Sequence, residues 1–193
     1  VLDRFADAVY RQQQSMPAAN PWRQVVHTEL WLVQPIDQPN RPVHRCHVAL
    51  NRPVLDGVLS DECWQNAEEV RLQTDGQRGE SDAGYTLAMI SRDNEYLYFA
   101  ASVRRNPLAP KVRPEKGPRS HDADLSRHDR ISLYLDVDRD YATWYAFHVD
   151  QRGKTSESCW DDASWDPRWY VAVDADETHW RVEAAIPFEE LAP

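Results

Sequence analysis

Between residues 85 and 187 the sequence alternates short β-type segments with polar turns, and this alternation restricts the fold more than any other feature. In residues 95–103, apolar side chains occupy both faces of an extended chain, as in a central strand. The tripeptide Arg92-Asp93-Asn94 before it is typical of a hairpin turn. The predicted strands span residues 85–91, 95–103, 131–136, 144–150, 169–175 and 178–186. Short, evenly spaced strands with little helix predict an all-β fold, an antiparallel β-sandwich of immunoglobulin or jelly-roll type.

The first 45 residues follow a different pattern. Apolar residues recur at helical spacing over residues 2–14 and predict an amphipathic helix, which Pro17 and Pro21 end. Residues 25–34 are rich in β-forming side chains and are interpreted as a strand, and a proline-punctuated, linker-like stretch follows. We therefore predict two parts, an N-terminal helix with an extended arm over residues 1–45 and a β-sandwich over residues 46–193.

Composition and charge exclude several classes of protein. The 193 residues are 41% hydrophobic and 28% charged, which is typical of a globular domain. The longest apolar run, residues 96–101, is far shorter than the roughly 20 residues of a membrane span, and we expect no signal peptide in these residues. A formal net charge of -10 argues against binding to nucleic acid, which needs a basic surface. Three cysteines without a C-x-x-C motif exclude a zinc ribbon and allow one disulfide at most.

Three smaller features are interpreted as structural. Residues 61–67 are predicted to form a short helix with Ser60 as its N-cap, and its Trp64 is expected to close one end of the sandwich. Trp180 alternates with polar neighbours and is expected in the core. Pro187 is well placed to begin a final helical turn.

The connection over residues 104–128 is long and carries no strand or helix pattern. Between residues 104 and 119, Glu115 is the single acid among six basic residues: Arg104, Arg105, Lys111, Arg113, Lys116 and Arg119. Loops of this length in compact domains are either functional or mobile. Two interpretations therefore stay open, a solvated loop and a lid or anion-contacting loop over residues 104–120.

Five segments of the chain match the motif order of a known family. They are residues 55–64 (LDGVLSDECW), 94–100 (NEYLYFA), 129–136 (DRISLYLD), 145–150 (YAFHVD) and 180–188 (WRVEAAIPF). In that order they resemble I-D-G-x-L-x-D-x-x-W, D-x-x-Y-L-Y-V-A, D-S-V-E-I-F-L-D, Y-Y-x-F-x-V-N and W-x-x-E-x-A-I-P-F of the family 9 carbohydrate-binding modules. The resemblance covers about residues 46–193. It implies an antiparallel β-sandwich related to the haem- and sugar-binding DOMON group, in an exported protein, and so an extracellular or periplasmic location.

The sugar-binding members of that family hold the sugar between two tryptophans, and neither can be carried over. The place of the first holds residues 126–129, which include Arg127 and no aromatic side chain. The second place lies beyond Pro193, so the resemblance implies a sandwich that is truncated at its C-terminal end. The candidate ligand-binding residues are therefore other aromatic and polar side chains: Trp144, Trp160, Trp165, Asp161, Asp162 and Arg127. For Trp165 and for Trp169, a structural role is the competing interpretation.

A metal site and a haem site are weaker candidates. Asp136, Asp138 and Asp140 alternate like the start of a calcium loop, but Tyr141 and Phe147 stand where an EF-hand needs Gly and Glu. Family members often carry structural calcium, so calcium binding and a solvated turn remain the two interpretations. Haem usually needs Met, His or Lys ligands, and the sequence has two methionines only.

No catalytic motif of the hydrolase, zinc-protease or nucleotide-binding type occurs in the sequence. We therefore expect a non-catalytic carbohydrate-binding module within a larger exported protein that degrades glycans, with an oligosaccharide or polysaccharide and the neighbouring domains as partners. The alternatives are a structural or protein-interaction sandwich that has lost the sugar site and a haem-binding DOMON-like domain.

Overall fold

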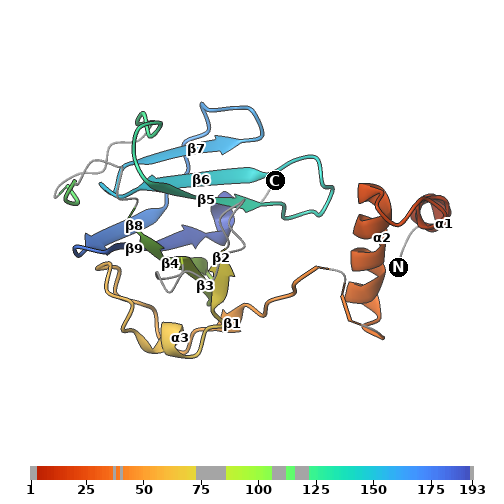
Figure 1. Cartoon of the computed structure of the whole chain (residues 1–193), viewed down its shortest axis with the longest axis horizontal. Helices are drawn as coiled ribbons and strands as arrows, with labels where there is room; N and C mark the ends of the chain where they lie inside the picture. The colour runs from red at the N-terminus through yellow and green to blue at the C-terminus, as the bar shows by residue number, and fades with distance from the viewer. Residues whose placement is uncertain are drawn as a thin grey trace. The chain divides into compact units, whose positions relative to one another are not determined.

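The computed structural model describes residues 4–36, 38–39, 41–72, 86–105, 112–115 and 122–191 of the chain (Figure 1). It divides into two compact units, Val1–Arg45 and Cys46–Pro193. Among the described residues, no helix is long and apolar enough to cross a membrane. The three cysteines are free thiols.

The first unit consists of two helices that contact each other, α1 (Arg4–Gln14) and α2 (Pro21–Val33). The predicted strand over residues 25–34 is therefore wrong, and Pro21 begins a helix. The reason is local: the side chain of Asn20 accepts a hydrogen bond from the backbone N–H of Trp22 at 2.9 Å, and Pro21 occupies the first turn. Helical hydrogen bonds form within the segment itself, whereas a strand needs a neighbour to pair with.

The second unit contains two sheets. The larger sheet has the order β1-β3-β4-β9-β8, with β2 also paired to β3, and the smaller sheet has the order β5-β6-β7. The strands of the larger sheet are β1 (His47–Val48), β2 (Val70–Leu72), β3 (Thr86–Arg92), β4 (Tyr96–Arg104), β8 (Tyr170–Ala175) and β9 (His179–Pro187). Those of the smaller sheet are β5 (Arg130–Leu135), β6 (Tyr145–Asp150) and β7 (Thr155–Cys159). The prediction of a β-sandwich is confirmed.

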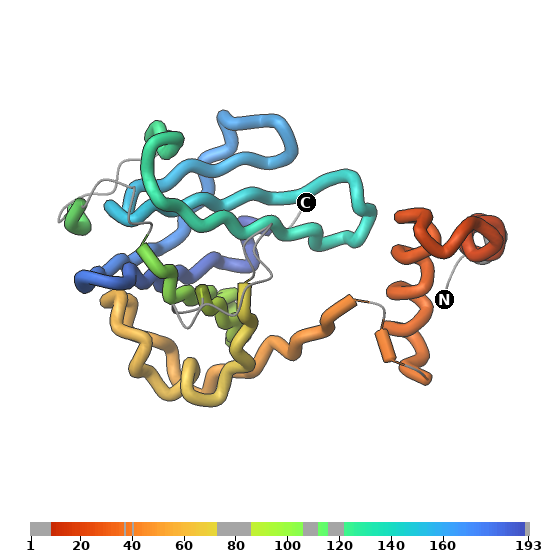
Figure 2. Tube along the Cα trace, viewed as in Figure 1, coloured from red at the N-terminus to blue at the C-terminus, as the bar shows by residue number. Residues whose placement is uncertain are grey.

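The sheets differ from the prediction in three respects, namely one parallel pair and two additional short strands. The β1–β3 pair is parallel, whereas every other pair is antiparallel. The short β2 and β7 were not predicted, because β2 has only three residues and β7 shows no apolar alternation. Figure 2 shows the chain passing from the larger sheet to the smaller one between β4 and β5 and returning between β7 and β8.

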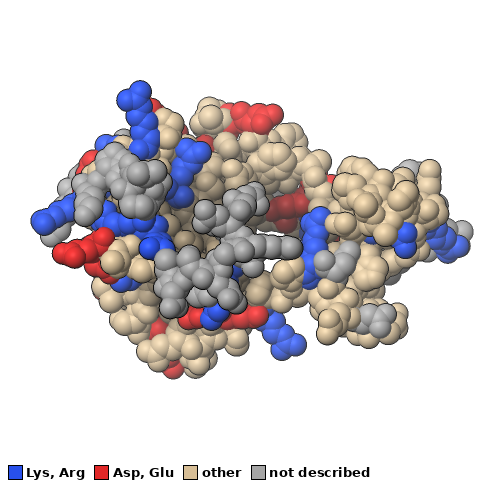
Figure 3. Space-filling model, in the orientation of Figure 1, with Lys and Arg blue, Asp and Glu red and all other residues tan. Residues whose placement is uncertain are grey.

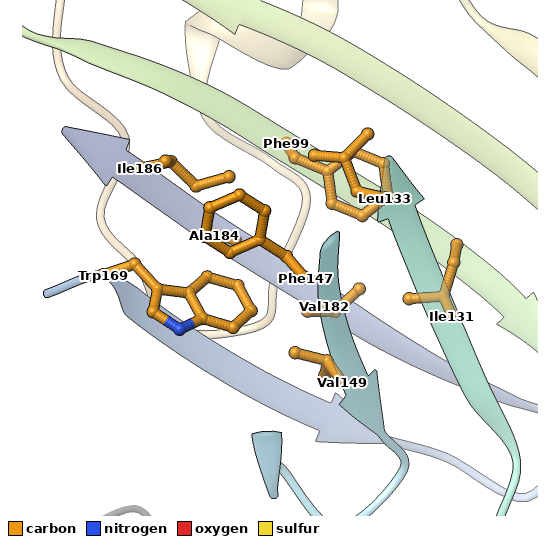
Figure 4. Close-up of a pocket in the computed structure, with 9 residues that line it drawn as sticks. All are labelled: Phe99, Ile131, Leu133, Phe147, Val149, Trp169, Val182, Ala184 and Ile186. Carbon is orange, nitrogen blue, oxygen red and sulfur yellow. The ribbon is translucent and has the colours of Figure 1, made fainter. Parts of the chain in front are cut away.

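The main core lies between the two sheets. Large side chains from β4, β6 and β9 meet there, including Phe99, Phe147 and Trp180, of which Trp180 is fully buried as predicted. A small space of about 10 Å³ remains, lined only by apolar and aromatic residues (Figure 4). It has room for about one water-sized sphere and no polar partner for it, so we regard it as a packing defect.

A second apolar cluster covers the other face of the larger sheet. Trp64, in α3 (Glu62–Gln65), packs there with Met89, Tyr98 and Ala100. Trp64 is thus buried, but it covers the outer face of the sheet rather than an end of the sandwich. The N-cap of α3 is Asp61, not Ser60. A 3₁₀ turn (Phe188–Glu190) follows Pro187, as predicted.

Candidate functional site

The smaller sheet has an outward face that carries polar and aromatic side chains. In β5, Ile131, Leu133 and Leu135 pack into the core, so the alternate residues of the same strand point away from it. The strand register then places residues of β6 and β7 beside them. We define the outward face by these residues: Arg130, Ser132, Tyr134, Trp144, Ala146, His148, Ser156 and Ser158.

Two exposed aromatic rings form the apolar part of the outward face. Tyr134 is 59% exposed and Trp144 is 39% exposed, and their ring centroids lie 6.5 Å apart at 75°. The imidazole of His148 lies on the other side of Tyr134, 5.7 Å away at 78°. These edge-on contacts hold the Tyr134 ring between two neighbours, so it is oriented before any ligand arrives.

The polar part of the outward face lies beside the aromatic rings. Ser132 and His148 are cross-strand partners, and the Ser132 hydroxyl lies 2.7 Å from Nδ1 of His148. Ser156 pairs with His148 from β7, and Ser158 pairs with Ala146. Burial lowers the pKa of His148, and the nearby charge of Arg130 lowers it further, so the imidazole is neutral at pH 7. The face therefore offers hydroxyl and imidazole groups that both donate and accept hydrogen bonds.

The structure brings two of the predicted tryptophans together and separates the third. The backbone N–H of Trp160 donates to the carbonyl oxygen of Trp144 at 2.9 Å, and the Trp160 side chain is 59% exposed. Trp165 instead packs against core residues, with its ring 5.1 Å from that of Tyr145 and 5.5 Å from that of Phe147. Trp169 is buried, and its indole N–H donates to Glu157.

The polar candidates from the sequence lie around the outward face rather than on it. Asp161 and Asp162 are exposed in the loop after β7, where Asp162 accepts hydrogen bonds from the backbone N–H and the hydroxyl of Ser164. Arg127 is exposed in the turn before β5. Sequence reasoning missed Tyr134, Ser132 and His148. The alternation of residues 130–135 could have identified Tyr134 and Ser132, because their β5 neighbours are all apolar.

The turn between β5 and β6 gathers three carboxylates. Asp136, Asp138 and Asp140 each offer an oxygen atom, and these atoms lie within 4.8 Å of one another. Oδ1 of Asp136 is buried and has no hydrogen-bond partner among the described residues, while Oδ2 accepts the backbone N–H of Tyr141 at 2.9 Å. The backbone N–H groups of Ala142 and Thr143 lower the pKa of Asp140, which keeps it ionised. An unpartnered carboxylate oxygen beside two further carboxylates fits a hard cation such as calcium.

The interior space does not resemble a ligand site. Its lining residues are Phe99, Ile131, Leu133, Phe147, Val149, Trp169, Val182, Ala184 and Ile186, all drawn in Figure 4. None of these side chains is a haem ligand, and about 10 Å³ cannot hold a porphyrin. The interior therefore gives no support to the haem-binding alternative.

Basic side chains gather at one end of the second unit, at the left of Figure 3. Most of the predicted basic loop, residues 106–111 and 116–121, lies outside the described residues. Of its described part, Arg105 donates to the carbonyl oxygen of Val112 at 3.3 Å, and Glu115 lies 3.4 Å from Lys154. The two interpretations of that loop stay predictions.

Comparisons with known proteins agree with this architecture. The sequence model of the family described as "Carbohydrate family 9 binding domain-like" matches residues 55–193. The chain belongs to this family. No curated protein sequence matches the chain.

Two solved structures resemble this family 9 domain. One is a family 9 carbohydrate-binding module from Caldicellulosiruptor kristjanssonii in complex with glucose, with a TM-score of 0.52 and 19% identity over 73% of this chain and 67% of that chain. The other is a module from the same organism in complex with cellotriose, with a TM-score of 0.49 and 18% identity over 74% of this chain and 66% of that one. The family 9 domain thus spans about two thirds of their length, and at this identity the first likeness shows the fold.

Proposed function

We propose that the family 9 domain is a non-catalytic carbohydrate-binding module that holds a glycan on the outward face of the β5–β6–β7 sheet. The observation that carries this proposal is the exposed pair of Tyr134 and Trp144, held edge to face beside a row of hydroxyl and imidazole groups. Sugars present apolar C–H faces and a rim of hydroxyl groups. Aromatic rings can cover those faces while the polar row bonds the rim.

The chemistry of the outward face favours a sugar over a protein partner. A protein interface would place its aromatic anchors in a desolvated apolar centre. Here Tyr134 contacts Trp144 and His148, and Ser132 and Ser158 lie nearby on the same face. Side chains that can both donate and accept hydrogen bonds suit a sugar, because each sugar hydroxyl can also do both.

The wider setting is also part of the proposal. We propose that the domain belongs to a larger, exported protein that degrades glycans, and that it keeps neighbouring catalytic domains close to their substrate. Its place would then be outside the cytoplasm, in the periplasm or the extracellular space. The support for this setting is membership of a carbohydrate-binding family.

We further propose that Asp136, Asp138 and Asp140 hold a calcium ion. The support is the short separation of their oxygen atoms and the unpartnered Oδ1 of Asp136. Bound calcium would offset the mutual repulsion of these carboxylates. Because Trp144 directly follows this turn, a fixed turn would also steady the aromatic part of the outward face.

Binding of glucose, cellotriose and a panel of longer neutral and acidic oligosaccharides, measured by calorimetry, tests the proposal. Tyr134→Ala and Trp144→Ala should each weaken the binding of whichever sugar binds by about tenfold or more, because each removes a stacking ring. Tyr170→Ala is the matched control, since Tyr170 is 51% exposed on β8 of the larger sheet. A folded domain that binds none of the sugars would overturn the proposal and favour the protein-interaction alternative.

A further inference from the structure

The outward face, as defined above, carries one arginine, Arg130. Arg130 is exposed at the start of β5, and it makes no ion pair with another described residue. It sits on a hydrogen-bonded strand, so its Cα position is fixed by the sheet rather than by a loop. The same strand carries Ser132 and Tyr134, the next two residues on that face.

The carboxylate nearest to Arg130 in the strand register is already engaged. Asp150 pairs with Arg130 across β5 and β6, but its side chain is fully buried. Its oxygens accept 2.8 Å hydrogen bonds from the backbone N–H and from Nε of Arg152. Arg152 also donates to the carbonyl oxygen of Asp124 at 3.1 Å. Asp150 and Arg152 therefore neutralise each other, and the charge of Arg130 is left for a ligand.

The neighbouring positions of the face add no negative charge. Ser132 and His148, which lie next to Arg130 on that face, are neutral.

From these observations we propose that the outward face is built for a glycan that carries carboxylates, a chain containing uronic acid, with Arg130 binding the carboxylate. This inference rests on the proposed sugar-binding function and specifies its ligand class. An arginine presents a planar fork of N–H donors that matches the two oxygens of a carboxylate. A neutral sugar leaves that fork without a charged partner.

The dimensions of the face suit a chain of several sugar units. Tyr134 and Arg130 are four residues apart on one strand, a separation of about 13 Å. One sugar ring stacked on Tyr134 and Trp144 would place the next units over Ser132 and His148. A later unit would then reach Arg130, so stacking and charge recognition act on different units of the same chain.

The test compares an oligogalacturonate with its fully methyl-esterified form, because esterification removes the carboxylate charge and adds only a methyl group to each unit. Calorimetry on the whole chain should give about tenfold tighter binding of the acid, as expected for hydrogen bonds to a charged group. Arg130→Gln should bring the ratio of acid to ester affinity to about one, because only the acid form offers a carboxylate to the guanidinium. Arg168→Gln is the control, since Arg168 is an exposed arginine that pairs with Glu189 and Glu190 outside the outward face.

The other outcomes distinguish a failure of this inference from a failure of the proposed sugar-binding function. Equal or tighter binding of the ester, or of cellotriose, with loss in Tyr134→Ala would overturn the inference and leave sugar binding intact. An equal loss of acid binding in Arg168→Gln would mean general charge attraction, which also overturns the role of Arg130. A preference for sulfated oligosaccharides over uronates would replace the carboxylate by a sulfate ester and overturn the assignment. No binding of any sugar would overturn both.

Discussion

The indole N–H of Trp64 donates a 2.7 Å hydrogen bond to Oε1 of Glu183, and both side chains are buried. The other oxygen of Glu183 accepts the backbone N–H of Gly57 at 2.8 Å and that of Asp56 at 3.1 Å. Burial raises the pKa of Glu183, and these three donors act in the opposite direction. One carboxylate of β9 thereby attaches residues 56–64 to the outer face of the larger sheet.

Trp64→Phe should lower the free energy of unfolding by about 1–3 kcal/mol, because it leaves a buried carboxylate oxygen without its donor while keeping most of the apolar contact. Trp22→Phe, at a 51% exposed position of α2, should change it by less than about 0.5 kcal/mol. Urea denaturation measures both. Equal stability of Trp64→Phe and the parent would show that the hydrogen bond contributes nothing net.

Two glycines with positive φ provide a matched pair. Gly57 has φ +82°, and an added Cβ would lie 2.4 Å from the backbone nitrogen of Asp174. Gly153 has φ +86°, but its added Cβ would lie 3.8 Å from the nearest atoms. Gly153→Ala should therefore cost about 1–2 kcal/mol from backbone strain alone. Gly57→Ala should cost clearly more, about 3 kcal/mol or above, because β8 must move. Chemical denaturation of both variants measures the loss in the free energy of unfolding, and equal losses would contradict this prediction.

Stability should fall on mild acidification because of His148. Its pKa is lowered in the folded state by burial and then by Arg130, whereas the unfolded chain has an ordinary value of about 6.5. Below about pH 6.5 the unfolded state therefore binds more protons, and the free energy of unfolding decreases as pH falls. The decrease continues down to the folded-state pKa of His148.

His148→Gln should flatten this part of the pH profile, measured by urea denaturation between pH 5 and 7.5. Ser132→Ala keeps the imidazole and removes only the hydroxyl at 2.7 Å, so it should preserve the dependence on pH. A His148→Gln variant with the full pH dependence of the parent would show that other groups cause it.

Calcium should raise the melting temperature if the three aspartates of the β5–β6 turn bind it. A hundredfold excess over the dissociation constant adds about 2.7 kcal/mol, or about 5–10 °C for a domain of this size. Asp138→Asn should lose most of this shift. Asp161→Asn, an exposed carboxylate in the loop after β7, should retain it. Identical melting in calcium and in chelator would count against the site.

The strands could be read from the sequence because their apolar residues alternate. This holds for residues 179–187, where apolar and charged side chains alternate at the start, whereas residues 96–104 were recognised by apolar side chains on both faces. It fails for β7, which reads Thr-Ser-Glu-Ser-Cys and is a strand because β6 offers it hydrogen-bond partners. It also fails for α2, where the Asn20 cap and Pro21 outweigh the β-forming residues near its end.

The candidate site was predictable only in part. Trp160 was identified because tryptophans beside acidic residues suit sugar recognition. Trp144 was a further candidate, and the two do lie together. Trp165, with the same kind of neighbours in the sequence, packs against Tyr145 and Phe147. Local sequence does not say which side of a loop faces the core, because that depends on which strand lies beneath it.

The sequence by itself determined the β-sandwich class and the family, since both depend on alternation and motif order along the chain. The tertiary structure alone decided which side chains share a surface. Tyr134 contacts Trp144 and His148 only after β5 and β6 pair in their register. Among the residues that the structure describes, Arg130 has no acidic partner, and Asp150, which pairs with it in the strand register, is bound by Arg152. Contacts between strands depend on register and twist, which no single segment encodes.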